Sequence, residues 1–210
     1  MSKRDDHRIA EFVLDAPIMR AFVAEAQAAI AGASSPQDAC AAIEPRFAEL
    51  LAASGWLPVE YQAAAPESGM GGGIGQWLLY RADDASLSLF SLVVPPSAET
   101  PIHDHLAWGL VGLYRGTQDE EIYTQRGGAL ELVEQRSLEP GDFYVLIPPR
   151  DDIHRVRTTS AETLVSIHLL TTTPAASGGT RGTRGVRSGK AVPVRVRQRG
   201  LRRLIKGFPG

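Results

Sequence analysis

Short apolar runs dominate the middle of the chain, from Gln76 to Leu170. Proline, glycine and aspartate separate the runs, which are WLLYR, LSLFSLVVP, WGLVGLYRG, EEIYT, ALELVEQRSL, DFYVLIPP, IHRVR and TLVSIHLL. In ALELVEQ apolar and polar residues alternate, as in a strand with one solvated face. Several short strands at this spacing are typical of an antiparallel barrel or sandwich. The sequence therefore predicts a mainly β domain over residues 76–170.

Residues 1–60 are predicted to form a pair of helices that pack on this β domain. The stretch FVLDAPIMRAFVAEAQAAIAG places apolar residues three and four positions apart, which is the period of a helix with one buried face. Ser35, Pro36 and Asp38 then have the pattern of an N-cap, a first-turn proline and a capping acid. We expect this second helix to run to Gly55. The glycines of residues 66–76 predict a loop, because no strand precedes a GxGxxG pattern there.

Composition excludes several classes of protein. A chain of 210 residues that is 43% hydrophobic can bury one good core. No apolar run approaches the roughly 18 residues of a membrane helix, and the N-terminal MSKRDDHRIAEF lacks the apolar region of a signal peptide. A single cysteine, Cys40, excludes an internal disulfide and lies in an apolar helical pattern, so it is predicted to be a small core residue. These features predict a cytoplasmic protein that makes no contact with a membrane.

Two histidines one residue apart, His103 and His105, are open to three interpretations. They could be solvated or backbone-bonded side chains, a catalytic acid–base pair, or two ligands of a metal ion. Residues i and i+2 of a strand project from the same face, so both imidazoles could point into a barrel interior. His154 follows a glycine turn and a strand, and could complete a three-histidine face from a neighbouring strand. Neutral imidazoles suit Fe, Zn, Cu and Ni.

The segments around these histidines resemble the two motifs of the cupin superfamily. The first motif, G-x5-H-x-H-x3,4-E-x6-G, is matched by its two histidines and its last glycine, with other residues in place of its first glycine and its glutamate: Ser97, His103, His105, Gly109 and Gly116. The second motif, G-x5-7-P-x-G-x2-H, is matched except at its second glycine: Gly141, Pro149, Asp151 and His154. The resemblance implies a cupin double-stranded β-helix, a jelly-roll barrel. With Gly109 at the glutamate position, the implied metal site has three neutral ligands.

Near the last predicted strand, Ser166-Ile167-His168 adds a further element of resemblance. Together the set HDH…WG…H…SxH, spread over residues 76–170, resembles the thiol dioxygenases, which include cysteine dioxygenase and 3-mercaptopropionate dioxygenase. The resemblance implies that His103, His105 and His154 bind Fe(II), and that Ser166 and His168 orient the iron-bound species. In that family both atoms of O2 end on the sulfur of a small thiol as a sulfinic acid. The alternative for Ser166 and His168 is a pair of inward strand residues bonded to backbone carbonyls.

The chain departs from that family at several positions. Leu170 replaces the tyrosine of the Ser-x-His-x-Tyr segment, and the position of the cross-linking cysteine of animal enzymes falls near Gly109. Arg81 lies where cysteine dioxygenases place the arginine that binds the substrate carboxylate; the alternative is an ordinary cation at a strand end. Trp108 is predicted to be a packing wall. Three histidines would also accept Zn, Ni or Mn.

Two other functions compete with thiol oxidation by O2. One is a cupin dioxygenase that acts on a different substrate, such as a diketone or a flavonol. The other is a non-catalytic cupin that senses a metal or a ligand. The implied partners are a small-molecule thiol and O2; a basic C-terminal tail is the one feature that hints at nucleic acid.

The C-terminal tail, residues 171–210, differs in composition from the rest of the chain and is predicted to be disordered. It holds ten of the 22 Lys and Arg residues and none of the 24 Asp and Glu residues, so residues 1–170 carry a formal charge of −12. One hypothesis is a basic tail for nucleic acid or an acidic partner. The other is a frameshift, since a shifted reading of the codons for residues 174–180 can spell Gly-Cys-Val-Trp-Arg-His, as in related dioxygenases.

Overall fold

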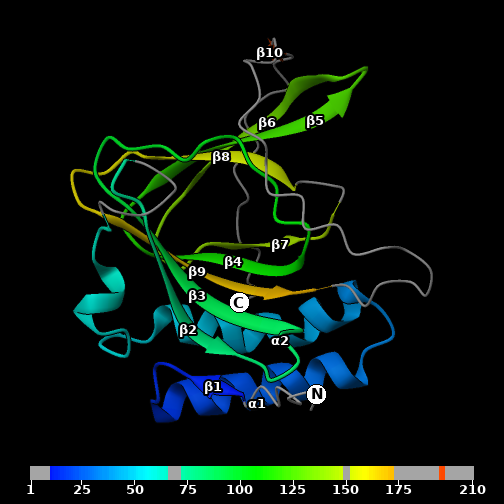
Figure 1. The fold of residues 1–210 in the computed structure, drawn as a ribbon, viewed down its shortest axis with the longest axis vertical. Helices are drawn as coiled ribbons and strands as arrows, with labels where there is room; N and C mark the ends of the chain where they lie inside the picture. The colour runs from blue at the N-terminus through cyan, green and yellow to red at the C-terminus, as the bar shows by residue number, and fades with distance from the viewer. Residues whose placement is uncertain (1–9, 66–71, 149–151, 173–193, 197–210) are drawn as a thin grey trace, which may run out of the picture.

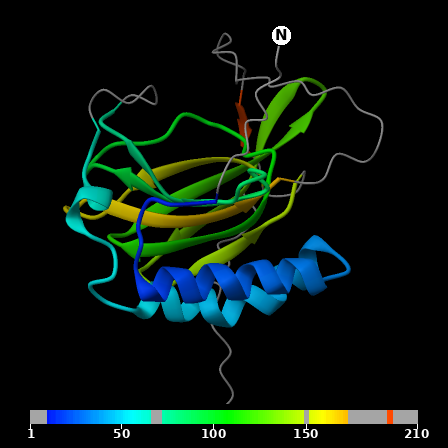
Figure 2. The same cartoon turned by 60° about the horizontal axis from the view of Figure 1, so that its bottom comes forward.

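The structure is a computed structural model, and it describes residues 10–65, 72–148, 152–172 and 194–196. Two β-sheets face each other, and two antiparallel helices cover the outer face of the larger sheet (Figures 1 and 2). The helical segments are α1 (Pro17–Gly32), α2 (Pro36–Ala52) and the short 3-10 helix η1 (Val59–Gln62).

The larger sheet has the strand order β1-β2-β3-β9-β4-β7, and the smaller sheet has the order β10-β6-β5-β8. Their bounds are β1 (Glu11–Phe12), β2 (Gly75–Arg81), β3 (Leu87–Val94), β4 (Trp108–Arg115), β5 (Gln118–Arg126), β6 (Ala129–Leu138), β7 (Phe143–Leu146), β8 (Ile153–Thr158), β9 (Leu164–Thr171) and β10 (Val194–Val196). Neighbouring strands are antiparallel except β10, which is parallel to β6. This arrangement is the cupin β-barrel, so the predicted fold class is confirmed.

All eight predicted apolar runs coincide with strands, β2 to β9. The two helices differ from the prediction at their ends. Phe12 belongs to the short strand β1, and α1 begins at Pro17, whose fixed φ suits a first helical turn. Ser35 caps α2 as predicted, since its side chain accepts a hydrogen bond from the Asp38 backbone N–H at 3.1 Å.

The predicted end of α2 at Gly55 is wrong by one turn, because the helix ends at Ala52. The indole Nε1 of Trp56 donates to the backbone carbonyl of Leu50 at 2.9 Å. A carbonyl that would otherwise continue the helix is therefore satisfied by a side chain. Gly55 follows in a left-handed conformation, with φ of 73°, and turns the chain away from the helix axis.

The main apolar core lies between the helices and the larger sheet. Residues of the sheet that face the helices alternate with residues that face the smaller sheet, so the core takes every second residue of β3 and β9. Its largest fully buried members include Tyr80, Phe47, Met19, Leu50 and Leu89. Cys40 is buried in this core, which raises the pKa of its thiol to about 11 and confirms a packing position.

A second apolar cluster lines the space between the two sheets. Its buried members include Leu92, Val111, Leu146, Val156 and Leu164. The opposite face of the larger sheet meets the helices, whereas this face meets both apolar side chains of the smaller sheet, such as Val156, and the polar side chains described below. One face of the larger sheet therefore packs against the helices, and the other face lines the interior that holds the polar groups described below.

The predicted tail and glycine loop fall largely outside the described residues. Thr171 is the last residue of β9 and Thr172 follows it, while Val194–Val196 form β10. No helix among the described residues is long and apolar enough to cross a lipid bilayer.

Gly112 on β4 gives a test of the packing between α2 and the sheet. A Cβ at this position would lie 2.4 Å from Leu51 Cδ1 and 2.8 Å from Phe47 Cε1. Gly112→Val should lower the free energy of unfolding by about 1–3 kcal/mol, because the helix must move away from the sheet. The measurement is urea unfolding followed by circular dichroism. Gly32→Ala is the control, since nothing lies within 4 Å of its Cβ, and it should be neutral or slightly stabilising. Equal effects of the two substitutions would contradict this packing.

Candidate metal centre

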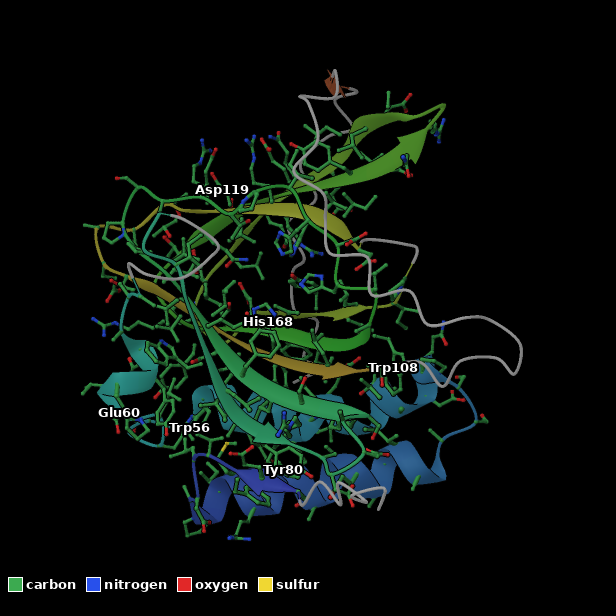
Figure 3. The ribbon with its side chains drawn as sticks, viewed as in Figure 1. Trp56, Glu60, Tyr80, Trp108, Asp119 and His168 are labelled. Carbon is green, nitrogen blue, oxygen red and sulfur yellow. The ribbon has the colours of Figure 1, made fainter. Side chains whose placement is uncertain are left out.

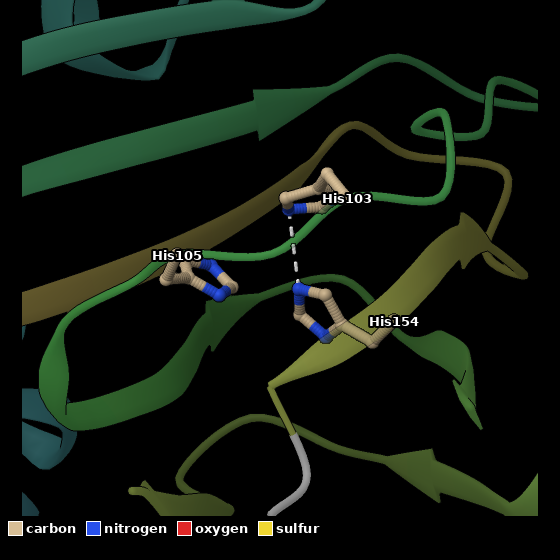
Figure 4. Close-up of side chains that lie close together, drawn as sticks. All are labelled: His103, His105 and His154. Atoms are coloured by element: carbon tan, nitrogen blue, oxygen red, sulfur yellow. Dashed lines mark hydrogen bonds between the residues drawn. The ribbon is translucent and has the colours of Figure 1, made fainter. Parts of the chain in front are cut away.

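Three histidines converge in the space between the sheets. The ligand atoms of His103, His105 and His154 all lie within 4.8 Å of one another. The ring centroids are 4.6 Å apart for His103 and His154, 4.8 Å for His105 and His154, and 5.0 Å for His103 and His105. Figure 4 shows the Nε2 atoms of His103 and His154 directed at each other, 3.2 Å apart. Three imidazoles in this geometry can hold one metal ion.

Backbone hydrogen bonds place two of these ligands. The N–H of His103 donates to the carbonyl of His154 at 3.0 Å, and the N–H of His154 donates back to His103 at 2.9 Å. This isolated antiparallel bridge joins the loop before β4 to β8. The expectation that His103 and His105 share one strand face is wrong, because β4 begins only at Trp108.

His105 reaches the cluster because a buried carboxylate holds its loop. Oδ1 of Asp152 accepts a hydrogen bond from the His105 backbone N–H at 2.8 Å and lies 3.5 Å from Nδ1 of the His105 ring. The backbone of the next residue, Leu106, is in the left-handed region, with φ of 52°. Its side chain gains little from packing, because the residue is 64% exposed. A turn of this kind is unfavourable for leucine, so the Asp152 contacts stabilise a loop that the sequence alone would not favour.

Each imidazole has an oxygen close to its Nδ1 atom. For His103 this is the backbone carbonyl of Pro101, at 2.9 Å; for His105 it is Asp152; for His154 it is Oε1 of Glu120, in a short hydrogen bond. A proton on Nδ1 leaves the lone pair of Nε2 free, which is the tautomer that binds a metal. With a proton on Nδ1, His103 and His154 would each direct an Nε2 lone pair at the centre of the cluster, whereas the Nδ1 of His105 makes no hydrogen bond among the described residues.

Electrostatics favour a neutral His103 and a charged Glu120. Burial, and after it the neighbouring His154, lower the pKa of His103 to about 4. Burial alone would raise the pKa of Glu120, but its contacts with His154 and Arg136 outweigh burial and lower the pKa to about 2. A neutral imidazole can bind a metal without first releasing a proton.

Ser166 and His168 lie on β9 and face the same interior as the three histidines. Ser166 Oγ is 2.9 Å from His168 Nε2, and the His168 ring stacks on Phe90 with centroids 4.7 Å apart. The centroid of His168 is 6.1 Å from that of His105, and Figure 3 marks its position on the larger sheet. Its Nδ1 is buried and has no hydrogen-bond partner among the described residues. The pKa of His168 lies well below its usual value, mainly because the ring is buried and secondly because the other histidines are close to it.

The other predicted residues lie farther out or on the opposite face. Arg81, at the end of β2, has a 41% exposed side chain whose Nη2 is 3.1 Å from Glu11 Oε2. Leu170 packs against the apolar cluster between the sheets. Trp108 is buried in the core beneath the helices, which agrees with a packing role. The structure thus brings His103, His105, His154 and His168 together, and it does not place Arg81 in contact with them.

Glu120 and Asp152 belong to the site and were missed by the sequence reading. Glu120 stands in the polar run QDEE, which the alternation rule treats as a solvated strand end. The signal that could have found it is the two-residue period of a strand. Gln118, Glu120 and Ile122 alternate with more exposed residues, so all three project from the same, buried face. Asp152 stands two residues before His154, and nothing in the sequence pairs it with His105.

Solved structures resemble this chain at low identity, whereas no protein-family model matches it. A cupin-2 domain of an XRE family transcriptional regulator from Enterobacter cloacae has 20% identity and a TM-score of 0.36, covering 47% of this chain and 95% of that one. A cupin-2 conserved barrel protein from Salinispora arenicola has 16% identity and a TM-score of 0.39, with 57% and 89% covered. Lactobacillus farciminis oxalate decarboxylase has 14% identity and a TM-score of 0.39, with 50% and 30% covered.

Removal of one ligand tests the cluster directly. A divalent ion at about 100 times its Kd should stabilise the wild-type chain by ~2.7 kcal/mol, which raises Tm by roughly 5–10 °C. His154→Ala should abolish this rise, as measured by thermal unfolding with Fe(II), Ni(II) or Zn(II). Arg157→Ala, on the exposed face of the same strand, is the control and should keep it. A His154→Ala chain that is still stabilised by the metal would place the ion elsewhere.

The metal-free chain should lose stability as the pH falls from 6.5 towards 4. His103 has its ordinary pKa of 6.5 in the unfolded chain and about 4 in the folded one, so in this window the unfolded chain binds more protons. Each such histidine lowers the free energy of unfolding by up to ~1.4 kcal/mol per pH unit. Urea unfolding of EDTA-treated protein at pH 7.5, 6 and 5 measures the slope. His103→Leu should show a shallower slope than wild type; equal slopes would contradict the assignment.

Proposed function

We propose that this chain is a non-haem Fe(II) thiol dioxygenase that converts a small thiol, such as cysteine or 3-mercaptopropionate, and O2 into a sulfinic acid. The observation that carries the proposal is a buried Ser166–His168 pair beside a cluster of three histidines, both in the interior between the two sheets. The overall reaction adds both oxygen atoms to one sulfur, so RSH and O2 give RSO2H with no further oxidant or reductant.

The residues fit such a metal in number and in tautomer. His103, His105 and His154 would hold the ion through Nε2, with their Nδ1 atoms directed at oxygens. Bound ferrous iron would supply open coordination positions for a thiolate and O2. Zn, Ni or Mn could occupy the same ligands, because three imidazoles do not select iron by affinity.

Ser166 and His168 are suited to orient a reacting group and to hold its proton. Stacking on Phe90 fixes the plane of the His168 ring, and the hydrogen bond to Ser166 fixes the role of Nε2. The Nδ1 atom is left buried and unpaired among the described residues, free to bond to a substrate. Because the pKa of His168 is lowered, this imidazole is neutral at pH 7 and can form a hydrogen bond with the reacting group without carrying a charge.

Apolar side chains exclude water from the same interior. Leu92 and Val111 are buried there, and Leu170 packs against them at the position where related dioxygenases have a tyrosine. With leucine in that position, the orienting groups proposed here are Ser166 and His168 alone. A dry interior strengthens each polar contact made within it.

Arg81 is proposed to contact the carboxylate of a carboxylated thiol. Its backbone pairs with Ser88, which pairs with Leu170, so the residue lies at the edge of the inward face of the larger sheet. Its guanidinium bonds Glu11 in the structure, so a substrate carboxylate would share or replace that contact.

An oxygen electrode tests the reaction with the iron-loaded chain. We expect consumption of one O2 per thiol with at least one of cysteine, cysteamine and 3-mercaptopropionate, and a sulfinic acid with two added oxygens by mass spectrometry under 18O2. His168→Ala should keep its iron and lose turnover by about 10- to 1000-fold. Loss of iron in that variant would make His168 a ligand. Metal binding without thiol-dependent O2 uptake would favour a sensing cupin or a dioxygenase with another substrate.

A further inference from the structure

A chain of buried polar contacts runs from the metal cluster to the far side of the barrel interior. Glu120 on β5 is fully buried, and its Oε1 accepts the hydrogen bond from His154 Nδ1. Its other oxygen, Oε2, accepts from Arg136 Nε at 2.6 Å. The guanidinium of Arg136, whose side chain is 9% exposed, lies 3.8 Å over the ring of Tyr144. One carboxylate thus joins a candidate ligand to a buried cation.

Fold stability alone does not account for this pair. Two charges removed from water cost several kcal/mol each, and apolar residues of similar volume commonly replace such a pair without loss of stability. The interior around it already supplies an apolar alternative in Leu138, Leu146 and Val156. An apolar pair in place of Glu120 and Arg136 could not accept the hydrogen bond from His154 Nδ1.

The pair also bears on the charge of the metal site. Gly109 stands at the glutamate position of the first cupin motif, and a Cβ there would lie 1.8 Å from the carbonyl oxygen of Leu169. A side-chain ligand is therefore excluded at that position. Glu120 and Asp152 place carboxylates behind two of the three imidazoles, and Arg136 offsets one of them. Arg136 pairs with Glu120, so the negative charge that remains beside the cluster is that of Asp152.

We propose that Glu120 is a positioning residue of the metal centre, which fixes the His154 ring through Nδ1 and makes that imidazole a stronger ligand. Arg136, held on the face of Tyr144, keeps the carboxylate aligned with His154. The inference rests on the metal-binding part of the proposed function and is independent of the substrate. A carboxylate behind a histidine ligand raises the basicity of that ligand and fixes its orientation.

The test compares Glu120→Gln with Glu121→Gln. Glu121 is the next residue on β5, pairs with Arg155 at 2.5 Å, and touches no candidate ligand, so it is a matched control. Competition between the protein and a chelator for Zn(II) should show 10- to 100-fold weaker binding in Glu120→Gln and a change of less than twofold in Glu121→Gln. The visible spectrum of the Co(II) form should change in Glu120→Gln alone, because a merely structural carboxylate would not alter the ligand field.

A double variant separates the loss of the carboxylate behind His154 from a loss of folding stability. An amide at position 120 offers one oxygen to two donors, so Glu120→Gln leaves either His154 or Arg136 unsatisfied. Glu120→Gln with Arg136→Met removes the second donor and should restore Tm, while Zn(II) binding stays weak because an amide oxygen is a weaker acceptor than a carboxylate for the His154 Nδ1–H. Wild-type affinity in the double variant, or equal losses in Glu120→Gln and Glu121→Gln, would overturn the proposal. Wild-type protein that binds Zn(II) tightly but oxidises no thiol would reject thiol oxidation and leave this inference intact.

Discussion

Two backbone hydrogen bonds between His103 and His154 determine how the barrel closes and where its polar interior lies. They tie the loop that enters β4, a strand of the larger sheet, to β8 of the smaller sheet. The preceding residues follow the same course, since Thr100 N–H bonds Val156 and Thr158 N–H bonds Ala98. One connecting segment thus extends the smaller sheet and delivers two imidazoles to a third. Without this bridge the histidines would belong to separate sheets, with no fixed distance between them.

The larger sheet has two faces with opposite roles. Towards the helices its side chains are apolar and closely packed, and Gly112 lets α2 approach the strands. Towards the smaller sheet the same strands carry Ser166 and His168 among leucine and valine. Buried polar groups of this kind are costly unless each has a partner. The packing of the helices on the sheet therefore offsets the free-energy cost of burying polar groups on its other face. Ser166 and His168 are held by a strand of this sheet and not by a loop.

The sequence predicted the strands well because their signal is local. Alternation and turn residues define β2 to β9, and the histidine spacing drew attention to the three ligands. The contacts of Glu120 and Asp152 are not local. Glu120 meets His154 only through the pairing of β5 with β8, and a register shift between Ile122 and Tyr123 alters the pairing of β5 with β6. The end of α2 was missed for a similar reason, because the Trp56 indole replaces a helical partner.

The central claim is that three histidines from two parts of the fold bind one metal ion, with carboxylates behind two of them. Anomalous diffraction from crystals of the Fe(II)-loaded chain, recorded on both sides of the iron absorption edge, tests this most directly. The account predicts a single peak about 2.0–2.3 Å from Nε2 of His103, His105 and His154. A peak bound through Nδ1, a peak that excludes any of the three rings, or a loaded crystal with no peak at this cluster would contradict it.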